Sequence, residues 1–212
     1  MVDAAKLTPS PVTGPFTADS LMLLHRALEW WVGHGFRYVD LPWMVPKEFS
    51  DATRPPECRD IQTLHGSFVA SGEQSFLQLW QAGQLWGAQG YVGWTPCLRD
   101  DVLDEFHQHG FMKAEWFVPL MAGNAGSWDD RLHHLVDEQA RLFCAMAQHA
   151  GERSPVRVDV VYPGAEQIDL MLNGVEIGSY GRRTFDGRQY LYGTALALPR
   201  FTQALASVPA DC

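Results

Sequence analysis

The chain has 212 residues, of which 46% are hydrophobic and 19% are charged. This length fits one domain, and the composition supplies enough apolar residues for a packed core, which excludes a disordered chain. The formal net charge is −9, and the longest basic cluster is the pair Arg182-Arg183. We therefore expect no stable complex with nucleic acid, because contacts from Lys and Arg to phosphates dominate such binding.

The sequence predicts no membrane segment, because no apolar run approaches the roughly 18 residues that a spanning helix needs. Its first residues lack a basic segment followed by an apolar one, so we expect no secretory signal. Four cysteines are scattered without a Cys-x-x-Cys pair: Cys58, Cys97, Cys144 and Cys212. Reduced thiols in the cytoplasm fit this pattern better than a disulfide framework does.

Helix and strand signals alternate irregularly through the first half of the chain. They predict helices over 19–34 and 74–85, a loop over 50–62, and strands over 36–46, 67–71, 90–98 and 109–121. Thr17 or Asp19 caps the first helix, because short polar side chains accept hydrogen bonds from the first backbone N–H groups of a helix. Pro42 and Pro46 interrupt the strand that follows, since proline lacks the N–H that a strand ladder needs.

The second half contains one long helix and then a run of strands. Ser127 caps a helix of about 20 residues. Four strands follow, separated by Gly, Asn and Asp turns: VRVDVVY, QIDLML, VEIGSYGRR and RQYLYGTALAL. The pattern becomes helical again from about Leu196. Because strands follow strands, we expect an α+β fold in which helices flank an antiparallel β-sheet. Residues 1–18 are expected to form an irregular arm and residues 19–212 one domain.

The helix over 19–34 is apolar on most of its surface. One face is shared by Leu21, Leu24, Leu28 and Trp31, and that face is widened by Met22, Leu23, Ala27 and Trp30. A helix with so little polar surface is buried on two sides. We therefore predict a homodimer in which a second subunit covers part of this helix.

One predicted hairpin gathers side chains that could carry chemistry. Arg99 ends its first strand, and Phe111, Lys113 and Glu115 alternate along its second strand, so these three point to one face. A guanidinium, an aromatic ring, an ammonium and a carboxylate suit a phosphate, a stacked base and an amine or hydroxyl. The alternative is a solvent-facing charged strand with one packed phenylalanine.

Polar residues later in the chain allow a metal or anion site. Glu176 could coordinate Mg²⁺ with the Ser179 hydroxyl or a water, and Arg200 beside a helix start could bind an anion. The alternatives are an ordinary strand glutamate, a turn serine and a surface arginine. The histidines lack partners at metal-ligand spacing, so we interpret them as solvated or structural: His107, His109, His133 and His134. The glycine signatures of Rossmann and P-loop nucleotide sites are absent from the sequence.

Together these segments resemble the catalytic core of class II aminoacyl-tRNA synthetases, and most closely that of the seryl-type enzymes. GFRYVDLPWMVP resembles the first signature of that family, a helix followed by a strand that ends in a proline at the dimer interface. VASGEQSF resembles the seryl-type Thr-x-Glu-Gln loop, and CLRDDVLDEFHQHGFMKAEWFV resembles the second signature. GTALALPR resembles the third signature. The resemblance extends over about residues 20 to 206, with the segments in the family's order.

The resemblance implies an ATP site and a role for each of its residues. Arg99 would bridge the α-phosphate of ATP and the carboxylate of the amino acid, and Phe111 and Arg200 would enclose the adenine. Glu176 and Ser179 would serve Mg²⁺ and the phosphates. Arg99, Glu176 and Arg200 would be the catalytic residues. The resemblance further implies an amino-acid pocket formed by Ser71, Glu73, Arg99, Lys113, Glu115 and Thr194.

Four positions depart from the family pattern. Asp101, which would belong to the ATP site, is shorter by one methylene than the family's acid at this place. His107 stands where an arginine that contacts the triphosphate is usual. Ser71 replaces the threonine of the amino-acid loop, and Gly72 enlarges the space beside it. Because no cysteine occupies the amino-acid pocket, we expect no zinc.

The function implied by this resemblance is ATP- and Mg²⁺-dependent activation of serine, glycine or alanine as an aminoacyl adenylate. About 18 residues precede the first predicted helix, so we expect no helical arm of the kind with which seryl-type enzymes bind tRNA. The expected acceptor is therefore a carrier protein, a small molecule or a nucleobase amine. One alternative is seryl-type tRNA aminoacylation with an arm supplied in trans. The other is a catalytically silent paralogue that acts as a regulatory or scaffold dimer.

Overall fold

The structure is a computed structural model that describes residues 17–54, 58–100, 104, 106–120, 128–149 and 156–207. Most of the expected N-terminal arm, Asp101, the predicted helix cap Ser127 and Cys212 lie outside these residues. Among the described helices, none is both long enough and apolar enough to cross a membrane. No disulfide joins the cysteines that lie within the described ranges.

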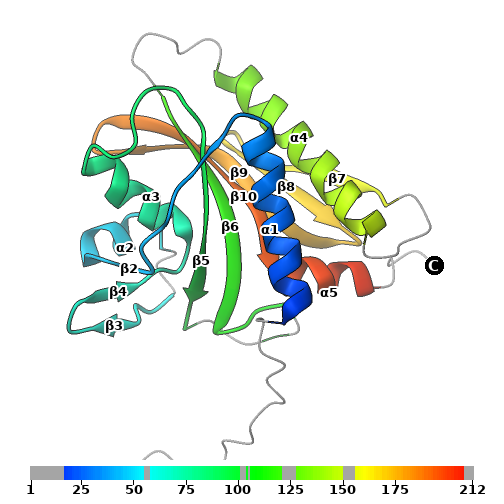
Figure 1. The fold of residues 1–212 in the computed structure, drawn as a ribbon, viewed down its shortest axis with the longest axis horizontal. Coiled ribbons are helices and arrows are strands. Elements are labelled where there is room, and N and C mark those ends of the chain that lie inside the picture. The colour runs from blue at the N-terminus through cyan, green and yellow to red at the C-terminus, as the bar shows by residue number, and fades with distance from the viewer. Residues whose placement is uncertain are drawn as a thin grey trace, which may run out of the picture.

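The chain folds into a large sheet, a small sheet and helices on both sides (Figure 1). The helices are α1 (Ala18–Gly33), α2 (Lys47–Thr53), α3 (Gly72–Gln81), α4 (Trp128–His149) and α5 (Arg200–Ala206). The short strands at the start are β1 (Arg37–Tyr38), β2 (Met44–Val45), β3 (Gln62–Thr63) and β4 (Gly66–Phe68). The longer ones are β5 (Tyr91–Leu98), β6 (Gly110–Pro119), β7 (Val158–Gly164), β8 (Gln167–Leu172), β9 (Val175–Phe185) and β10 (Arg188–Leu198).

The large sheet has seven strands in the order β1-β5-β6-β10-β9-β8-β7, and the small sheet has the order β2-β4-β3. Neighbouring strands of the large sheet are antiparallel, except that β1 runs parallel to β5. The predicted α+β fold with helices flanking an antiparallel sheet is therefore confirmed, with one parallel strand at an edge.

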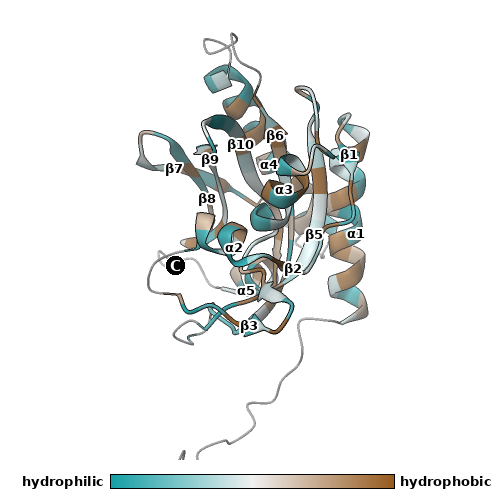
Figure 2. Ribbon diagram, turned by 90° about the vertical axis from the view of Figure 1, so that its left-hand side faces the viewer, coloured by the Kyte–Doolittle hydropathy of each residue, from teal (hydrophilic) through white to brown (hydrophobic). Residues whose placement is uncertain are grey.

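Alternation along β6 explains the two layers that cover the sheet. Trp116 and the other even-numbered residues Met112, Ala114 and Val118 lie in the hydrophobic core formed with α1, α4 and α5. Phe117 points to the opposite face, where its ring stacks on Phe76 of α3 and on Tyr190 of β10. Successive strand residues point to opposite faces of a sheet, so one strand serves both cores. Figure 2 shows α2 and α3 in front of the large sheet, on the side away from α4.

Most predicted elements occur in the structure, and three segments differ. The predicted loop over 50–62 is wrong in part, because α2 reaches Thr53 and buries Phe49. The interrupted strand over 36–46 divides into β1 and β2, which join different sheets. The final helix begins at Arg200 rather than near Leu196, because β10 continues to pair with β6 as far as Leu198.

Helix α1 begins as predicted, with the Thr17 side chain accepting a hydrogen bond from the Ser20 backbone N–H at 3.1 Å. Its buried residues are Leu24, Ala27 and Trp31. Leu21, on the predicted apolar face, is 48% exposed, so the chain itself does not cover this part of the face. Apolar side chains thus remain on the outer side of the helix, where the predicted second subunit would lie.

Candidate functional site

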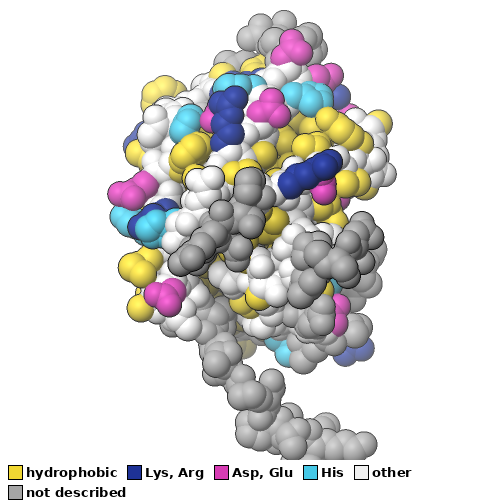
Figure 3. All heavy atoms as spheres, turned by 90° about the vertical axis from the view of Figure 1, so that its right-hand side faces the viewer, with side chains coloured by type: hydrophobic (Ala, Val, Ile, Leu, Met, Phe, Trp, Pro, Cys, Tyr) yellow, Lys and Arg dark blue, Asp and Glu magenta, His cyan; other side chains and the backbone are white. Residues whose placement is uncertain are grey.

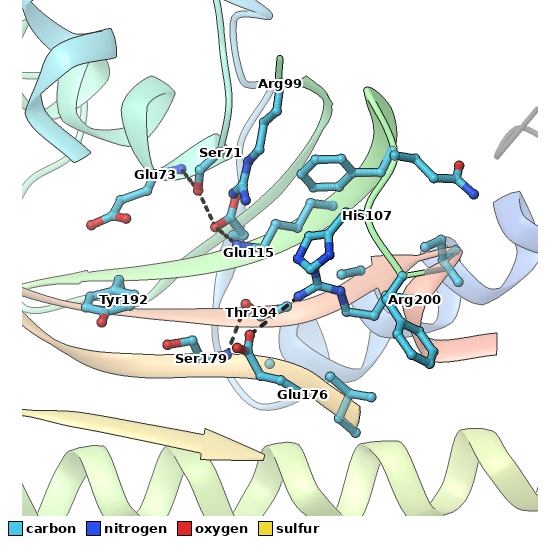
Figure 4. A pocket seen from close by; sticks show the side chains of 18 of the residues that line it. Ser71, Glu73, Arg99, His107, Glu115, Glu176, Ser179, Tyr192, Thr194 and Arg200 are labelled. Atoms are coloured by element: carbon cyan, nitrogen blue, oxygen red, sulfur yellow. Dashed lines mark hydrogen bonds and ion pairs between the residues drawn. The ribbon is translucent and has the colours of Figure 1, made fainter. Parts of the chain in front are cut away.

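A cavity of about 190 Å³ lies against the face of the sheet that carries α2 and α3. Its walls come from β6, β9 and β10, from the start of α3 and from the chain before α5. The predicted site residues that fall within the described ranges all line this cavity: Ser71, Glu73, Arg99, Phe111, Lys113, Glu115, Glu176, Ser179, Thr194 and Arg200. Their assigned roles remain predictions, but the structure brings these side chains together (Figure 4).

Strand register places the two central side chains beside each other. Thr194 on β10 pairs with Glu115 on β6, and the register shifts between Thr194 and Leu196. A bulge of this kind turns the next residues to the other face, so Leu196 enters the core while Ala197 lines the cavity. A second shift, opposite Leu170 and Met171 of β8, interrupts β9 in the same way.

Glu115 is a buried carboxylate that accepts three hydrogen bonds. Its Oε1 accepts from the Ser71 hydroxyl at 2.6 Å and from the Lys113 ammonium at 2.7 Å. Its Oε2 accepts from the backbone N–H of Gly72. Burial alone raises the pKa of Glu115, but the Lys113 charge and these hydrogen bonds hold it below its usual value. Glu115 is therefore an anion, matched by Lys113 inside the cavity.

Gly72 contributes close packing rather than space. A Cβ atom at this position would lie 2.9 Å from Oε2 of Glu115 and 3.3 Å from Oγ1 of Thr95. The expectation that glycine enlarges the pocket is therefore wrong, because the Glu115 carboxylate occupies that volume. A larger residue at this position would require the Glu115 carboxylate to shift.

Arg99 lies where β5 ends, as predicted. Its Nε donates to the backbone oxygen of Ala70 at 2.9 Å, and its guanidinium carbon lies 5.0 Å from the centre of the Phe111 ring. The His109 backbone oxygen accepts from the Arg99 N–H at 2.9 Å, which closes the hairpin at this point. These contacts orient the guanidinium along the aromatic wall of the cavity.

Glu176 and Ser179 lie at different places along the cavity. An oxygen of Glu176 lies 3.6 Å from an Arg200 nitrogen, whereas Ser179 lies toward Tyr192 (Figure 4). The backbone N–H of Ser179 donates to the Thr194 hydroxyl at 3.4 Å. A Mg²⁺ ion bound with nucleotide takes most ligands from phosphates and water, so the single Glu176 carboxylate fits it. Among the described residues, no three His, Cys, Asp or Glu side chains cluster as a metal site.

His107 also lines the cavity. Its Nδ1 lies 2.7 Å from an oxygen of Asp104, and this hydrogen bond lowers the pKa of that carboxyl. This contact fits the interpretation of His107 as a solvated or structural histidine, and it places the ring at the cavity. In His133, Nδ1 lies 2.7 Å from the backbone oxygen of Asp129 in the same helix, a contact that fits a structural role.

Glu73 has partners that the sequence did not predict. Its Oε1 accepts from the Tyr190 hydroxyl at 2.7 Å, and its Oε2 accepts from the Arg183 guanidinium at 2.6 Å. Burial raises the pKa of Glu73, while Arg183 and Tyr190 oppose that rise. Burial acts to lower the pKa of Arg183, but Glu73 raises it above its usual value. Arg183 was missed, although its spacing from Ser179 along β9 places both on one face.

The surface agrees with the acidic composition. On the face drawn in Figure 3, Lys and Arg side chains are separated by acidic, hydrophobic or other side chains. The described residues of that face therefore form no continuous basic surface of the kind that binds a nucleic-acid backbone.

Solved structures of known proteins share this architecture. The seryl-tRNA synthetase of Pyrococcus horikoshii, complexed with ATP, is 19% identical, with a TM-score of 0.62 over 89% of this chain and 49% of that chain. The cytoplasmic serine-tRNA ligase of Naegleria fowleri, in complex with AMP, is 18% identical, with a TM-score of 0.65 over 91% of this chain and 48% of that chain. A pyrrolysyl-tRNA synthetase of Desulfitobacterium hafniense is 14% identical, with a TM-score of 0.64 over 89% of this chain and 69% of that chain.

This chain has the fold of a class II aminoacyl-tRNA synthetase catalytic core. It spans about half the length of the two seryl-type structures. No protein-family model and no curated protein sequence matches it. In this class II fold the cavity lies on the face of the sheet that carries α2 and α3, between the end of α2, the start of α3 and the start of α5.

Proposed function

We propose that the protein uses ATP and Mg²⁺ to activate a small amino acid as an aminoacyl adenylate. One observation carries this proposal: Arg99, Phe111 and Arg200 share a single cavity with the buried Glu115–Lys113 pair. The first group suits the phosphates and base of ATP, and the second suits the polar head of an amino acid. The fold shared with synthetases solved with ATP and AMP supports nucleotide use.

Adenylate formation requires the amino-acid carboxylate to attack the α-phosphorus while the bond to pyrophosphate breaks. Arg99 would hold the carboxylate and an α-phosphate oxygen together, since its planar fork can bind two oxygens. Phe111 and Arg200 would enclose the adenine, and His107 would meet the triphosphate. The positive charges of Arg99 and Arg200 would stabilise the negative charge that grows on the phosphate oxygens. Asp101 belongs to this proposed ATP site and lies outside the described residues.

Mg²⁺ would be held by Glu176 together with phosphate oxygens, and when bound it neutralises phosphate charge. Ser179 would serve Mg²⁺ and the phosphates with Glu176, and its backbone N–H donates to the Thr194 hydroxyl at 3.4 Å.

The amino acid would lie between Ser71, Lys113, Glu115 and Thr194. Because Glu115 is buried and anionic, its remaining acceptor capacity suits the substrate ammonium group. Large apolar amino acids would fit poorly here, since they would remove water from polar groups without replacing its hydrogen bonds. Serine, glycine and alanine are therefore the proposed substrates.

The acceptor of the acyl group would be a carrier-protein thiol, a small molecule or a nucleobase amine rather than an arm-bound tRNA. The net charge of −9 supports this choice. The active form would be a homodimer. A groove lined by Leu21, Leu28, Val32, Tyr38 and Trp94 supports this, because apolar side chains remain exposed along it.

Amino-acid-dependent ATP–pyrophosphate exchange tests this function. The twenty amino acids are assayed singly with the wild-type protein and with Arg200→Met, alongside Arg188→Met as a control that removes an arginine stacked on Trp80. We expect exchange with small amino acids, its loss in Arg200→Met, and its retention in Arg188→Met. Absence of exchange with every amino acid would favour a silent scaffold instead.

A further inference from the structure

The Glu73–Arg183 pair forms one end of the cavity, beside Tyr192 (Figure 4 shows Glu73 and Tyr192). Both oxygens of Glu73 already accept hydrogen bonds, one from Tyr190 and one from Arg183. The Arg183 contact is also an ion pair, with the two side chains 2.6 Å apart. The contacts of Glu73 therefore indicate that it orients the Arg183 guanidinium.

Arg183 presents hydrogen-bond donors to the cavity. Its guanidinium carbon lies 4.1 Å from the centre of the Tyr192 ring, and its side chain is 41% exposed. In the described part of the chain, Glu73 Oε2 is its hydrogen-bond acceptor. A guanidinium has five N–H donors, so donors remain for a molecule bound in the cavity. The Tyr192 ring and the Glu73 carboxylate fix the plane of the group.

Charge at this end of the cavity is already balanced. Glu73 lies 2.6 Å from Arg183, and Glu115 lies 2.7 Å from Lys113. A bound side chain with its own charge would find no uncompensated partner. An apolar side chain would displace water from the Arg183 donors without accepting their hydrogen bonds, which is costly. An uncharged side chain that carries an acceptor oxygen avoids both penalties.

Thr53, at the end of α2, lines the same cavity. Its hydroxyl oxygen is buried and has no hydrogen-bond partner among the described residues. Buried hydroxyl groups are normally hydrogen-bonded, so this one has capacity for a ligand group. Thr53 and Arg183 thus both line the cavity.

We propose that Arg183 is a specificity-determining residue that selects an amino acid with an uncharged, oxygen-bearing side chain. Glu73 is a positioning residue that holds the guanidinium for this contact. The inference rests on the proposed adenylation reaction and defines its substrate by the chemistry of the side chain. Serine and asparagine meet the requirement, whereas alanine and glycine lack the oxygen and aspartate adds a charge.

The test compares pyrophosphate exchange with serine, asparagine, alanine, glycine and aspartate. The main variant is the double substitution Glu73→Gln/Arg183→Met, which removes both charges and leaves no buried ion unpaired. Its matched control is Glu166→Gln/Arg182→Met, which removes the neighbouring surface pair, whose atoms lie 3.0 Å apart. The single variant Glu73→Gln tests positioning, and thermal melts show that each variant is folded.

For the wild type we expect serine or asparagine to exceed alanine by about a hundredfold in kcat/KM, since a site built for hydrogen bonds rejects analogues that lack them. The double variant lowers kcat/KM for serine and asparagine to the level of alanine, and the control pair keeps the preference. Glu73→Gln raises KM for serine while KM for ATP stays constant.

Two results would overturn the inference while adenylation itself survives. The first is a wild type that prefers alanine, glycine or aspartate, and the second is a folded double variant that keeps the wild-type preference. No exchange with any amino acid would instead overturn the proposed function, and this inference with it.

Discussion

The backbone N–H of Gly72 donates a hydrogen bond to Oε2 of Glu115, and a Cβ at Gly72 would lie 2.9 Å from that oxygen. Gly72→Ala would therefore move the carboxylate away from the substrate position. We expect KM for the amino acid to rise about tenfold, the effect of losing about 1.4 kcal/mol of binding. The control is Gly33→Ala, because a Cβ at Gly33 meets nothing within 4 Å. Equal KM values in both variants would contradict this role for Gly72.

The substitution Glu115→Gln tests whether the buried Glu115–Lys113 pair stabilises the protein in a pH-dependent way. Breaking a buried ion pair costs about 3 kcal/mol of unfolding free energy. The pKa of Glu115 is lowered by folding, so its contribution is present above the unfolded pKa of about 4.3 and is lost as pH falls through the folded pKa. The free energy of unfolding is measured with urea at pH 7, 5 and 3.5 for both proteins. The excess of the wild type over Glu115→Gln should be smallest at the lowest pH. An advantage that is constant with pH would show that Glu115 is not held as an anion.

Arg99→Lys separates a working site from a surface arginine. Lysine keeps the charge but loses the planar fork, so it cannot hold a carboxylate and a phosphate oxygen together. We expect exchange to fall by a hundredfold to a thousandfold, about 3–4 kcal/mol in the transition state. Arg59→Lys, at a side chain that is 86% exposed, is the control. Full activity of Arg99→Lys would refute the bridging role, and a large fall in melting temperature would indicate a structural arginine.

Helix α1 and the groove beside it predict the oligomeric state. Leu21 is 48% exposed and Val32 is 46% exposed. We expect light scattering of the wild type to give about twice the chain mass of 23.8 kDa. The double variant Leu21→Asp/Val32→Asp should give the mass of a single chain. Val161→Asp on β7, also an exposed apolar position, should leave the dimer intact. A wild-type protein that is monomeric at micromolar concentration would exclude this interface.

The sequence predicted the site face because alternation is local. Phe111, Lys113 and Glu115 follow one another at every second residue, and that spacing alone fixes their common direction on β6. Segments of the right type in the right order also predicted the fold. Their packing then brings residues from α3, β6 and β10 to one cavity, as the resemblance implied.

The remaining contacts depend on pairings that no local pattern encodes. Glu73 and Arg183 are separated by 110 positions in the sequence, and their ion pair forms only when α3 packs over β9 and β10. The bulge after Thr194 changes which residues face the core, so alternation could not be followed through it. Helix α2 escaped prediction because it is short and polar, and packing of Phe49 stabilises it.

Direct detection of the adenylate tests the central claim most sharply. Wild-type protein in excess is mixed with α-³²P-labelled ATP, Mg²⁺, inorganic pyrophosphatase and serine, with Arg99→Lys in parallel. Pyrophosphatase removes the pyrophosphate that would reverse the reaction, so a protein-bound labelled seryl adenylate should accumulate with the wild type. Arg99→Lys should accumulate less of this adenylate than the wild type does. If ATP stays intact in the wild type with serine, asparagine, glycine and alanine alike, this cavity does not form aminoacyl adenylates.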